Sequence, residues 1–428
     1  MKGQIRFIDL FAGIGGIRKG FELACKAKSF EPVCVFTSEI KEAAVKILKQ
    51  NHPKENIAGD ITQVSADSIP DFDFLLAGFP CQAFSSAGRR LGFADTRGTL
   101  FFDVERILKE KQPFGFVLEN VEGLVNHDKE KPSDKIGRTL STILAHLEDL
   151  DYKISWKVLN AADFGVPQER KRIYIVGTKK SAPDLNDFVK KTKKLKDILQ
   201  TGLPVESSSF IDNLLSHFKV HELYGKSIKD KRGGDNNIHS WDIEMKGPVS
   251  KEQKDLLNIM LKERRKKKWA EIIGIDWMDG MPLTAEQIRT FYDKPNLEMM
   301  LNDLVDKKYI RFEHPKKKTS AGRVYDVNLP KGYNIVAGKM SFEVNKVLDP
   351  EEIAPTLVAM DMQHLYVPDD EGIRTLSLRE GLRLFGYPDK FKFDIDKKAG
   401  YDLLGNTVVV PVIEAVSAKV LDIYEKEV

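Results

Sequence analysis

The first 180 residues alternate between short apolar runs and amphipathic stretches, and this alternation restricts the fold more than any other feature of the chain. The apolar runs lie at residues 5–10, 32–38, 72–77, 115–118 and 172–177. The stretches with helical character lie at residues 16–27, 42–49, 97–111 and 140–147. Strands that alternate with helices form a parallel sheet covered by helices on both faces. We therefore predict an α/β fold for this part of the chain.

The alternation stops near residue 180, and the following segment is more polar, basic and irregular up to about residue 350. A helical pattern returns at residues 400–424, which we interpret as the chain rejoining the first domain. At 428 residues the chain is long enough for two buried cores. We predict two domains, one formed by residues 1–180 plus 395–428 and the other by residues 181–394.

Composition excludes several classes of protein. The three cysteines, Cys25, Cys34 and Cys81, exclude a disulfide framework, and no Cys/His cluster has the spacing of a zinc site, so we expect no metal. No apolar run has the length of a membrane span, and the N-terminus lacks a signal-peptide pattern. We therefore expect a cytoplasmic protein with no membrane partner.

Basic residues are concentrated in the middle of the chain, although the net charge is only +3. Three runs of lysine and arginine lie at residues 190–194, 262–268 and 316–318. A single run of this kind usually forms a solvated face. Three runs within one segment favour a polyanionic partner.

Part of this segment has the element order of a winged helix. Residues 284–289 resemble a capped helix, a second helix begins at Asn296, and residues 309–312 and 323–327 are expected to pair as a hairpin around a lysine-rich tip. In that arrangement, over residues 284–327, the second helix would read the major groove. The alternative is a small helical insert that only packs.

Acidic residues follow a glycine turn at the ends of successive predicted strands. The turn is the segment Asp9-Leu10-Phe11-Ala12-Gly13-Ile14-Gly15-Gly16, and Glu39 and Asp60 come after it. Glycines at such a position let the backbone approach a ligand, and an acid after the second strand can accept both ribose hydroxyls of an adenosine. Each acid alone could be a loop carboxylate or a helix cap. Together they favour an adenosyl ligand without a pyrophosphate.

A cysteine and a glutamate follow the next two predicted strands. Cys81 lies in a Phe-Pro-Cys-Gln turn and Glu119 in Leu-Glu-Asn-Val, and a right-handed crossover would bring them to one edge of the sheet. A thiolate adds to electron-poor ring carbons, while a nearby acid can protonate a ring nitrogen. A structural salt bridge is the alternative for Glu119. Arg170 and Arg172 could hold a base carbonyl and phosphates.

Taken in order, these segments resemble the cytosine-5 DNA methyltransferases of bacterial restriction–modification systems. The resemblance covers about residues 1–180 and 350–428. It implies a Rossmann-like methyltransferase sheet as the catalytic domain and a smaller target-recognition domain, which is the segment that contains the winged-helix pattern. The matching motifs are Asp9-Leu10-Phe11-Ala12-Gly13, the turn at Cys81, Arg97-Gly98-Thr99-Leu100, Glu119-Asn120-Val121, Gln168-x-Arg170-x-Arg172, Arg379-Glu380 and Gly405-Asn406-Thr407-Val408.

The resemblance also implies a reaction. S-adenosyl-L-methionine would donate the methyl group and leave as S-adenosyl-L-homocysteine, and a cytosine flipped out of double-stranded DNA would receive it. Cys81 would attack carbon 6, Glu119 would protonate or hydrogen-bond nitrogen 3, and Arg172 would hold the base carbonyl oxygen. Arg170 is counted with these three as a catalytic residue. We expect a monomer on DNA, located at the bacterial nucleoid. The residues implied for the donor pocket are Phe11, Gly13, Ile14, Gly15, Glu39, Ile40, Asp60, Ile61, Pro80, Leu100 and Asn406.

Two other functions are consistent with part of this pattern. A close branch of the family methylates a tRNA cytosine, but the large basic segment with a predicted major-groove helix favours DNA, because the deep, narrow major groove of RNA would not admit that helix. A DNA-binding regulator without activity is the other alternative. The presence of Cys81, Glu119 and Arg172 together argues against it.

Overall fold

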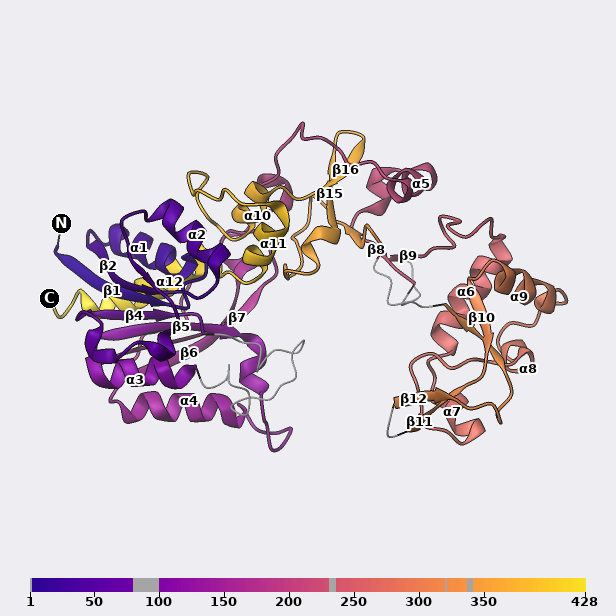
Figure 1. Ribbon diagram of the computed structural model, residues 1–428, viewed down its shortest axis with the longest axis horizontal. Coiled ribbons are helices and arrows are strands. Elements are labelled where there is room, and N and C mark those ends of the chain that lie inside the picture. Colours follow the sequence, from indigo (N-terminus) through magenta and orange to yellow (C-terminus); the bar gives the residue numbers. More distant parts are fainter. Residues whose placement is uncertain (1, 80–99, 231–235, 320–321, 337–341) are drawn as a thin grey trace. The chain divides into compact units, whose positions relative to one another are not determined.

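The computed structural model describes residues 2–79, 100–230, 236–319, 322–336 and 342–428. They form two compact units (Figure 1). Unit 1 consists of Met1–Gln200, Pro350–Gln363 and Leu376–Val428, and unit 2 of Thr201–Asp349 and His364–Thr375. The functional division into residues 1–180 plus 395–428 and residues 181–394 stays a prediction.

Unit 1 is built on a seven-stranded sheet with the strand order β3-β2-β1-β4-β5-β7-β6. The pairs among β1 to β5 are parallel, as predicted, but β7 runs antiparallel to both β5 and β6. Only a short connection joins β6 to β7, and parallel strands need a longer crossover. The sequence analysis missed β6. The strands are β1 (Gln4–Leu10), β2 (Glu31–Ser38), β3 (Ile57–Ala58), β4 (Phe74–Ala77), β5 (Gly115–Val121), β6 (Lys153–Asn160) and β7 (Lys171–Thr178).

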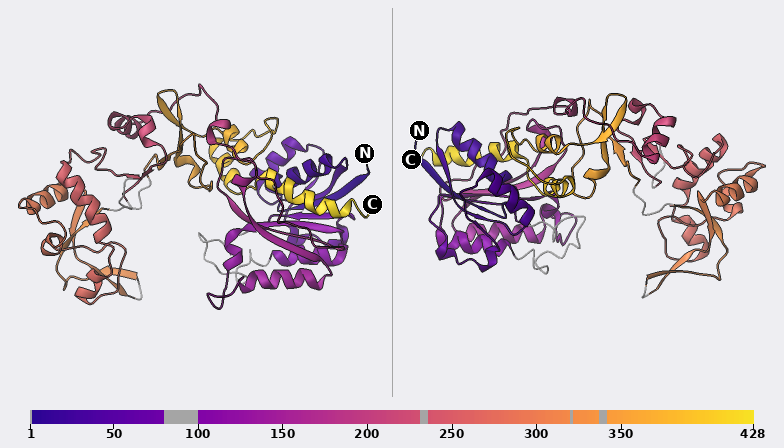
Figure 2. Two further views of the ribbon diagram at one scale, coloured as in Figure 1. Left: turned by 180° about the vertical axis from the view of Figure 1, so that it is seen from behind. Right: turned by 45° about the horizontal axis from the view of Figure 1, so that its top comes forward.

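Helices cover both faces of this sheet (Figures 1 and 2). On one face, α1 (Gly16–Ala27) packs against α12 (Val410–Tyr424), and Phe21 of α1 lies 5.1 Å from Phe7 and 5.3 Å from Phe74, measured between ring centroids. On the other face, α3 (Phe101–Lys111) and α4 (Arg138–Asp149) bury side chains that include Ile8 and Leu10 of β1. Phe7 and Ile8 point to opposite faces, as alternating strand residues do.

The C-terminal segment contributes three helices to unit 1: α10 (Leu378–Leu384), α11 (Lys397–Gly405) and α12. Among the described residues, one stretch, Lys397–Tyr424, is long and apolar enough to cross a membrane, and 61% of its apolar window is buried in the protein. Because α12 packs on α1 and on the sheet, core burial accounts for this apolar composition. The remaining helix of the unit is α2 (Glu42–Asn51).

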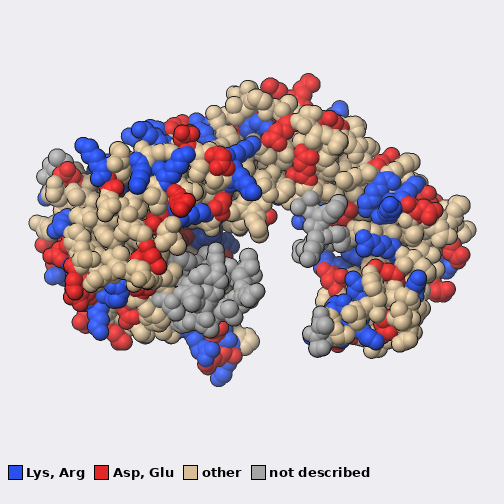
Figure 3. All heavy atoms as spheres, viewed as in Figure 1, with Lys and Arg blue, Asp and Glu red and all other residues tan. Residues whose placement is uncertain are grey.

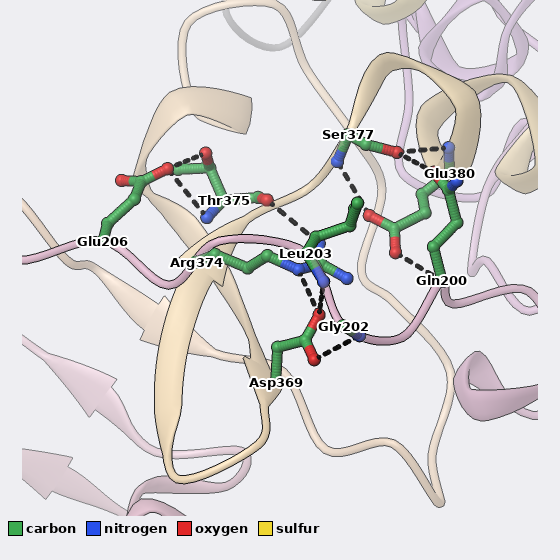
Figure 4. A network of polar contacts seen from close by, with 9 residues as sticks. All are labelled: Gln200, Gly202, Leu203, Glu206, Asp369, Arg374, Thr375, Ser377 and Glu380. Atoms are coloured by element: carbon green, nitrogen blue, oxygen red, sulfur yellow. Dashed lines mark hydrogen bonds and ion pairs between the residues drawn. The ribbon is translucent and has the colours of Figure 1, made fainter.

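A capping box begins α10 (Figure 4). The Glu380 backbone N–H donates to Ser377 Oγ at 3.1 Å, and the Ser377 N–H donates to Glu380 Oε2 at 2.7 Å. The Gln200 N–H donates to the other carboxylate oxygen, Oε1, at 2.8 Å. Glu380 therefore fixes both the start of α10 and the last residue of the first segment of unit 1.

Unit 2 contains a five-stranded sheet with the order β16-β15-β14-β8-β9. Asp369 anchors it by accepting hydrogen bonds from the backbone N–H groups of Gly202 (2.9 Å) and Leu203 (3.2 Å) and from Arg374 Nε (2.7 Å; Figure 4). These bonds satisfy a buried ion pair. The elements are α5 (Ser209–His217), β8 (Ser227–Ile228), β9 (Asn237–Ile238), β14 (Lys346–Val347), β15 (Leu365–Asp369) and β16 (Gly372–Thr375).

The rest of unit 2 forms a second core, which we call the helical module (residues 241–335). The predicted helices at 284–289 and from Asn296 are present as α8 and α9, but the predicted hairpin is wrong, because β10 pairs with β13 and not with residues 323–327. Residues 322–325 instead pair with 316–319. The winged-helix assignment stays a prediction. The elements are α6 (Lys251–Glu263), α7 (Lys268–Ile273), α8 (Ala285–Arg289), α9 (Leu297–Asp306), β10 (Ile310–Glu313), β11 (Lys316–Thr319), β12 (Gly322–Tyr325) and β13 (Gly332–Ile335).

Candidate active site

A cavity of about 450 Å³ opens in unit 1 at the carboxyl ends of β1, β2, β4 and β5. Ligands of open α/β sheets bind at this edge. Gly15 is not part of the lining, and Pro80 and Cys81 lie outside the described residues. The site residues predicted from the sequence that line the cavity are Phe11, Gly13, Ile14, Glu39, Ile40, Asp60, Ile61, Leu100, Glu119, Arg170, Arg172 and Asn406.

The turn after β1 has an unusual backbone. Phe11, Gly13 and Gly15 all have positive φ angles, of 54°, 56° and 81°. Glycine adopts this conformation readily, whereas for Phe11 it costs on the order of 1 kcal/mol. Strain of this kind is concentrated at functional sites. Gly15 has a structural role, because it precedes α1 and a Cβ there would lie 3.2 Å from Leu48 Cδ2.

The carboxylate of Glu39 holds two loops of the cavity in place. Its Oε2 accepts a hydrogen bond from the Gly13 N–H at 2.7 Å, and its Oε1 accepts one from the Lys41 N–H at 2.7 Å. An ionised carboxylate has about four lone-pair sites, so each oxygen keeps capacity for one more donor. Glu39 is therefore both a structural link and an acceptor that faces the cavity.

Asp60 and Ile40 provide the cavity with a polar and an apolar lining residue. Asp60 Oδ1 caps a short helical turn by accepting from the Thr62 N–H at 3.0 Å and from Thr62 Oγ1 at 2.9 Å. Oδ2 has no hydrogen bond within the part of the chain that the structure describes. Ile40 is 73% exposed, which is unusual for a large apolar side chain. This wall can accept a hydrogen bond from a flat ligand and cover one of its faces.

Glu119 is the buried acid of the site. Its Oε1 lies 3.3 Å from Arg172 Nε. Burial raises the pKa of Glu119 above its ordinary value, and the positive charges of Arg172 and Arg170 oppose that shift. A carboxyl group with a raised pKa keeps its proton to higher pH. Glu119 is therefore suited to donate a proton or a hydrogen bond to a ligand in the cavity.

The chain that leads toward Cys81 is held beside Glu119. A Cβ on Gly78 would lie 3.9 Å from Glu119 Oε2, so the backbone after β4 runs directly along this carboxylate. The neighbouring Asn120 donates from Nδ2 to the Phe79 carbonyl oxygen at 3.2 Å. These contacts fix Gly78 and Phe79, and Phe79 is the first residue of the Phe-Pro-Cys-Gln turn and the last one described before Cys81.

Arg170 was predicted to contact a base or a phosphate, but in the structure its side chain bonds to the protein backbone. Its Nη1 donates to the Leu357 carbonyl at 2.9 Å, and its Nη2 donates to the carbonyls of Thr407 at 2.9 Å and Gly405 at 3.2 Å. The guanidinium is buried over the ring of Phe385. Both terminal nitrogens of Arg170 thus donate to main-chain carbonyls, and we assign this side chain a positioning role.

Replacing Arg170 with methionine is expected to lower the free energy of unfolding by about 3 kcal/mol or more. The variant keeps the length of the side chain but leaves three carbonyl oxygens without their donor, and each unsatisfied buried group costs about 1–3 kcal/mol. Urea unfolding followed by circular dichroism measures the change. The exposed Lys171→Met is the matched control, with an expected change below about 0.5 kcal/mol. Equal stability of the two variants would contradict the assignment.

The cavity is also lined by residues to which the sequence analysis assigned no role in the site. Lys41 and Asp402 form an ion pair at its rim, and Thr407 Oγ1 hydrogen-bonds Tyr387 Oη at 2.8 Å. Asp402 lies one helical turn before Asn406, and the residues around it form no recognisable motif. Only its spacing from the Gly-Asn-Thr motif could have indicated that Asp402 lines the cavity. Among the described residues, no group of three or more His, Cys, Asp or Glu side chains is arranged to hold a metal ion.

Curated relatives match the chain along nearly its whole length. The Type II methyltransferase M.NlaIV of Neisseria lactamica is 66% identical over 418 residues, which cover 98% of this chain and 99% of that protein. M.NgoBV of Neisseria gonorrhoeae is 65% identical with the same coverage. M.BanI of Aneurinibacillus aneurinilyticus is 43% identical over 440 residues, covering 96% of this chain and 95% of that protein.

Solved structures share the fold at low sequence identity. A DNA modification methyltransferase encoded within an E. coli prophage superposes with a TM-score of 0.54 at 21% identity, covering 98% of this chain and 99% of that one. DNMT2 of Spodoptera frugiperda gives a TM-score of 0.51 at 15% identity, covering 97% and 99%. These likenesses support the predicted methyltransferase fold.

The family model for C-5 cytosine-specific DNA methylases matches residues 5–422. Together with relatives above 60% identity along the chain, this confirms the resemblance predicted from the motifs. The protein therefore belongs to the C-5 cytosine-specific DNA methylases and is a DNA (cytosine-5-)-methyltransferase.

Proposed function

We propose that the cavity binds S-adenosyl-L-methionine and that the enzyme methylates carbon 5 of a cytosine flipped out of double-stranded DNA. The observation that carries this proposal is the convergence of Glu39, Asp60 and Glu119 on one cavity at the edge of the sheet. Its volume lies within the range of about 300–1,000 Å³ that is usual for small-molecule sites. The first two acids serve the donor, and the third serves the base.

The donor half of the cavity fits an adenosyl group. Glu39 offers a remaining acceptor site on each oxygen for the ribose hydroxyls, and Asp60 Oδ2 offers one for an exocyclic amine. Ile40 and Ile61 supply apolar surface for the base, and the turn from Phe11 to Ile14 lets backbone approach the rest of the molecule. When bound, the donor supplies an electrophilic methyl group.

The other half serves the target base. The thiolate of Cys81 adds to carbon 6 of the cytosine while Glu119 gives its proton to nitrogen 3, so electron density builds at carbon 5. Arg172, which is held beside Glu119, donates a hydrogen bond to the carbonyl oxygen of the base. After carbon 5 takes the methyl group, it loses its proton to solvent, and the electrons of that C–H bond restore the double bond between carbons 5 and 6. The Cys81 sulfur leaves carbon 6 as a thiolate with the electrons of the C–S bond, and nitrogen 3 returns its proton to Glu119.

Replacing Glu39 with glutamine is expected to raise the Kd for the methyl donor about 10-fold or more. The change removes the negative charge that strengthens hydrogen bonds to the ribose. It also places the glutamine NH₂ group, a donor, opposite one of the two backbone N–H donors, that of Gly13 or that of Lys41. Isothermal titration calorimetry with S-adenosyl-L-homocysteine measures the effect. Glu42→Gln, an exposed acid three residues away, is the control. Unchanged affinity in the Glu39 variant would remove Glu39 from the donor site.

Relatives named Type II methyltransferases support the role of modification enzyme in a type II restriction–modification system. We further propose that the enzyme acts as a monomer on DNA at the nucleoid. Bisulfite sequencing of plasmid DNA from cells that express the protein tests the modification role. We expect 5-methylcytosine at every copy of one short sequence. Absence of methylation, or methylation without a common sequence, would contradict the proposal. Transfer of labelled methyl to tRNA in preference to duplex DNA would favour the alternative substrate.

A further inference from the structure

The predicted reader of the major groove, α9, has the wrong charge for that task. The helix contains three acidic residues and no lysine or arginine. Its exposed positions are Glu298, Met299, Asn302 and Asp306, and Met299 is 68% exposed. DNA carries one negative charge per about 1.7 Å of its axis, so this face would be repelled when it approached the phosphates. On the face shown in Figure 3, Lys and Arg side chains are mixed with Asp and Glu side chains.

The strands β11 and β12 have the opposite composition. Together they hold four basic residues and no acid, and we call this two-stranded element the basic ribbon. Lys318 lies directly opposite Arg323, and Lys316 lies opposite Tyr325 on the same face. Like charges placed opposite each other destabilise a strand pair. A polyanion on this face would relieve the repulsion between Lys318 and Arg323.

Aromatic side chains accompany these cations. Tyr325 is 48% exposed, and Lys316 Nζ lies 4.6 Å from the centre of its ring. Trp277 is 39% exposed and stands in the loop after α7. A two-stranded ribbon fits the width of the major groove of DNA. The Tyr325 hydroxyl already donates to Glu313 Oε2 at 2.9 Å, so the lysine and arginine side chains are the phosphate-binding groups of this element.

Hydrogen bonds join the basic ribbon to a second basic segment. Arg323 Nη2 donates to the Trp277 carbonyl at 2.9 Å, and Trp277 Nε1 donates to the Arg265 carbonyl at 2.9 Å. Residues 266–268, three exposed lysines, follow Arg265 directly. Arg264 is excluded from this surface, because it is buried and its Nη1 donates to Asn334 Oδ1 at 2.7 Å.

We propose that the basic ribbon, together with Lys266, Lys267 and Lys268, binds the phosphate backbone of the DNA substrate, and that α9 does not read the DNA. The proposal rests on the assignment of duplex DNA as the substrate and specifies which surface of the helical module contacts it. It replaces the sequence-based expectation for α9.

The double variant Lys316→Gln/Lys318→Gln tests the proposal on the full-length enzyme. Each phosphate contact contributes about 0.9 to the slope of log K against log salt concentration, so the slope is expected to fall by about 2. The affinity for a labelled duplex should fall about 30-fold near 0.15 M salt, by the same relation. Fluorescence anisotropy between 50 and 200 mM salt, roughly the range over which such slopes are defined, measures both.

Lys251→Gln/Lys308→Gln is the matched control, because it removes the same charge from exposed positions of the helical module outside the ribbon. We expect its salt slope to equal that of the unaltered enzyme. A wild-type slope in the ribbon variant, or an equal loss in the control, would overturn the proposal. Methyl transfer to duplex DNA by the unaltered enzyme is measured separately, and its absence would refute the substrate assignment rather than the ribbon.

A second variant tests α9 itself. Met299→Ala/Asn302→Ala changes two exposed positions of the helix without altering charge. We expect this variant to bind DNA with the affinity of the unaltered enzyme. Bisulfite sequencing should show that it methylates the same sequence motif. Relaxed or altered motif sequence would show that α9 reads bases and would overturn the proposal.

Discussion

Cys81→Ser is expected to lower the rate of methyl transfer by about 10⁴-fold or more while DNA and donor binding persist. Loss of a covalent nucleophile removes a whole reaction path, and losses of this order follow when a nucleophile is deleted. Binding survives because the sulfur acts only after the base has entered the cavity. Single-turnover transfer of labelled methyl measures the rate, and anisotropy with a duplex measures binding.

The other two cysteines provide the control. Burial raises the pKa of Cys34 to about 12, so its thiol stays protonated and unreactive, and the same cause raises the pKa of Cys25 to about 12. Cys34→Ser should therefore keep methyl transfer within a factor of a few. If Cys81→Ser were active, or if Cys34→Ser alone were inactive, the covalent role of Cys81 would be wrong.

Glu119→Gln is expected to reduce kcat by about 10²- to 10⁴-fold, the usual contribution of a general acid. The pH profile should also change. Burial raises the pKa of Glu119, and the protonated form is the one that acts, so the rate of the unaltered enzyme should fall as the pH rises through that pKa. Glutamine does not titrate, so the variant should lack this alkaline decline. Stopped assays at saturating DNA across the pH range give both results.

Glu122→Gln is the matched control for this variant, since Glu122 is exposed and lies three residues further along the chain. We expect its rate and its pH profile to match those of the unaltered enzyme. Should the alkaline decline persist in Glu119→Gln, another group would be responsible for it.

The sequence predicted the local parts of the site well. Glycines after β1 and acids after β2 and β3 follow apolar strands closely, and parallel strands bring their carboxyl ends together, so Gly13, Glu39 and Asp60 could be placed on one cavity. The antiparallel β7 and the pairing of β10 with β13 were mispredicted, because strand partners depend on the length and path of the connections.

Side chains with distant partners were the hardest to interpret. Arg170 lies in a basic run that suggested a ligand contact, but its partners are carbonyls 187, 235 and 237 residues away. Arg264 also lies in a basic run that favoured a polyanionic partner, but its side chain bonds to Asn334, which is 70 residues away in the sequence. No local pattern distinguishes an arginine that binds phosphate from one that is buried among carbonyls.

The long-range bonds of Arg170 have a consequence for protein synthesis. The cavity is lined both by residues from the range 11–61 and by residues from the range 402–407, and Arg170 donates to carbonyls of the second group. A ribosome must therefore synthesise the chain beyond Asn406 before the cavity can form. A prematurely terminated chain that ends before Asn406 lacks part of the cavity, so incomplete translation products are expected to leave the genome unmarked.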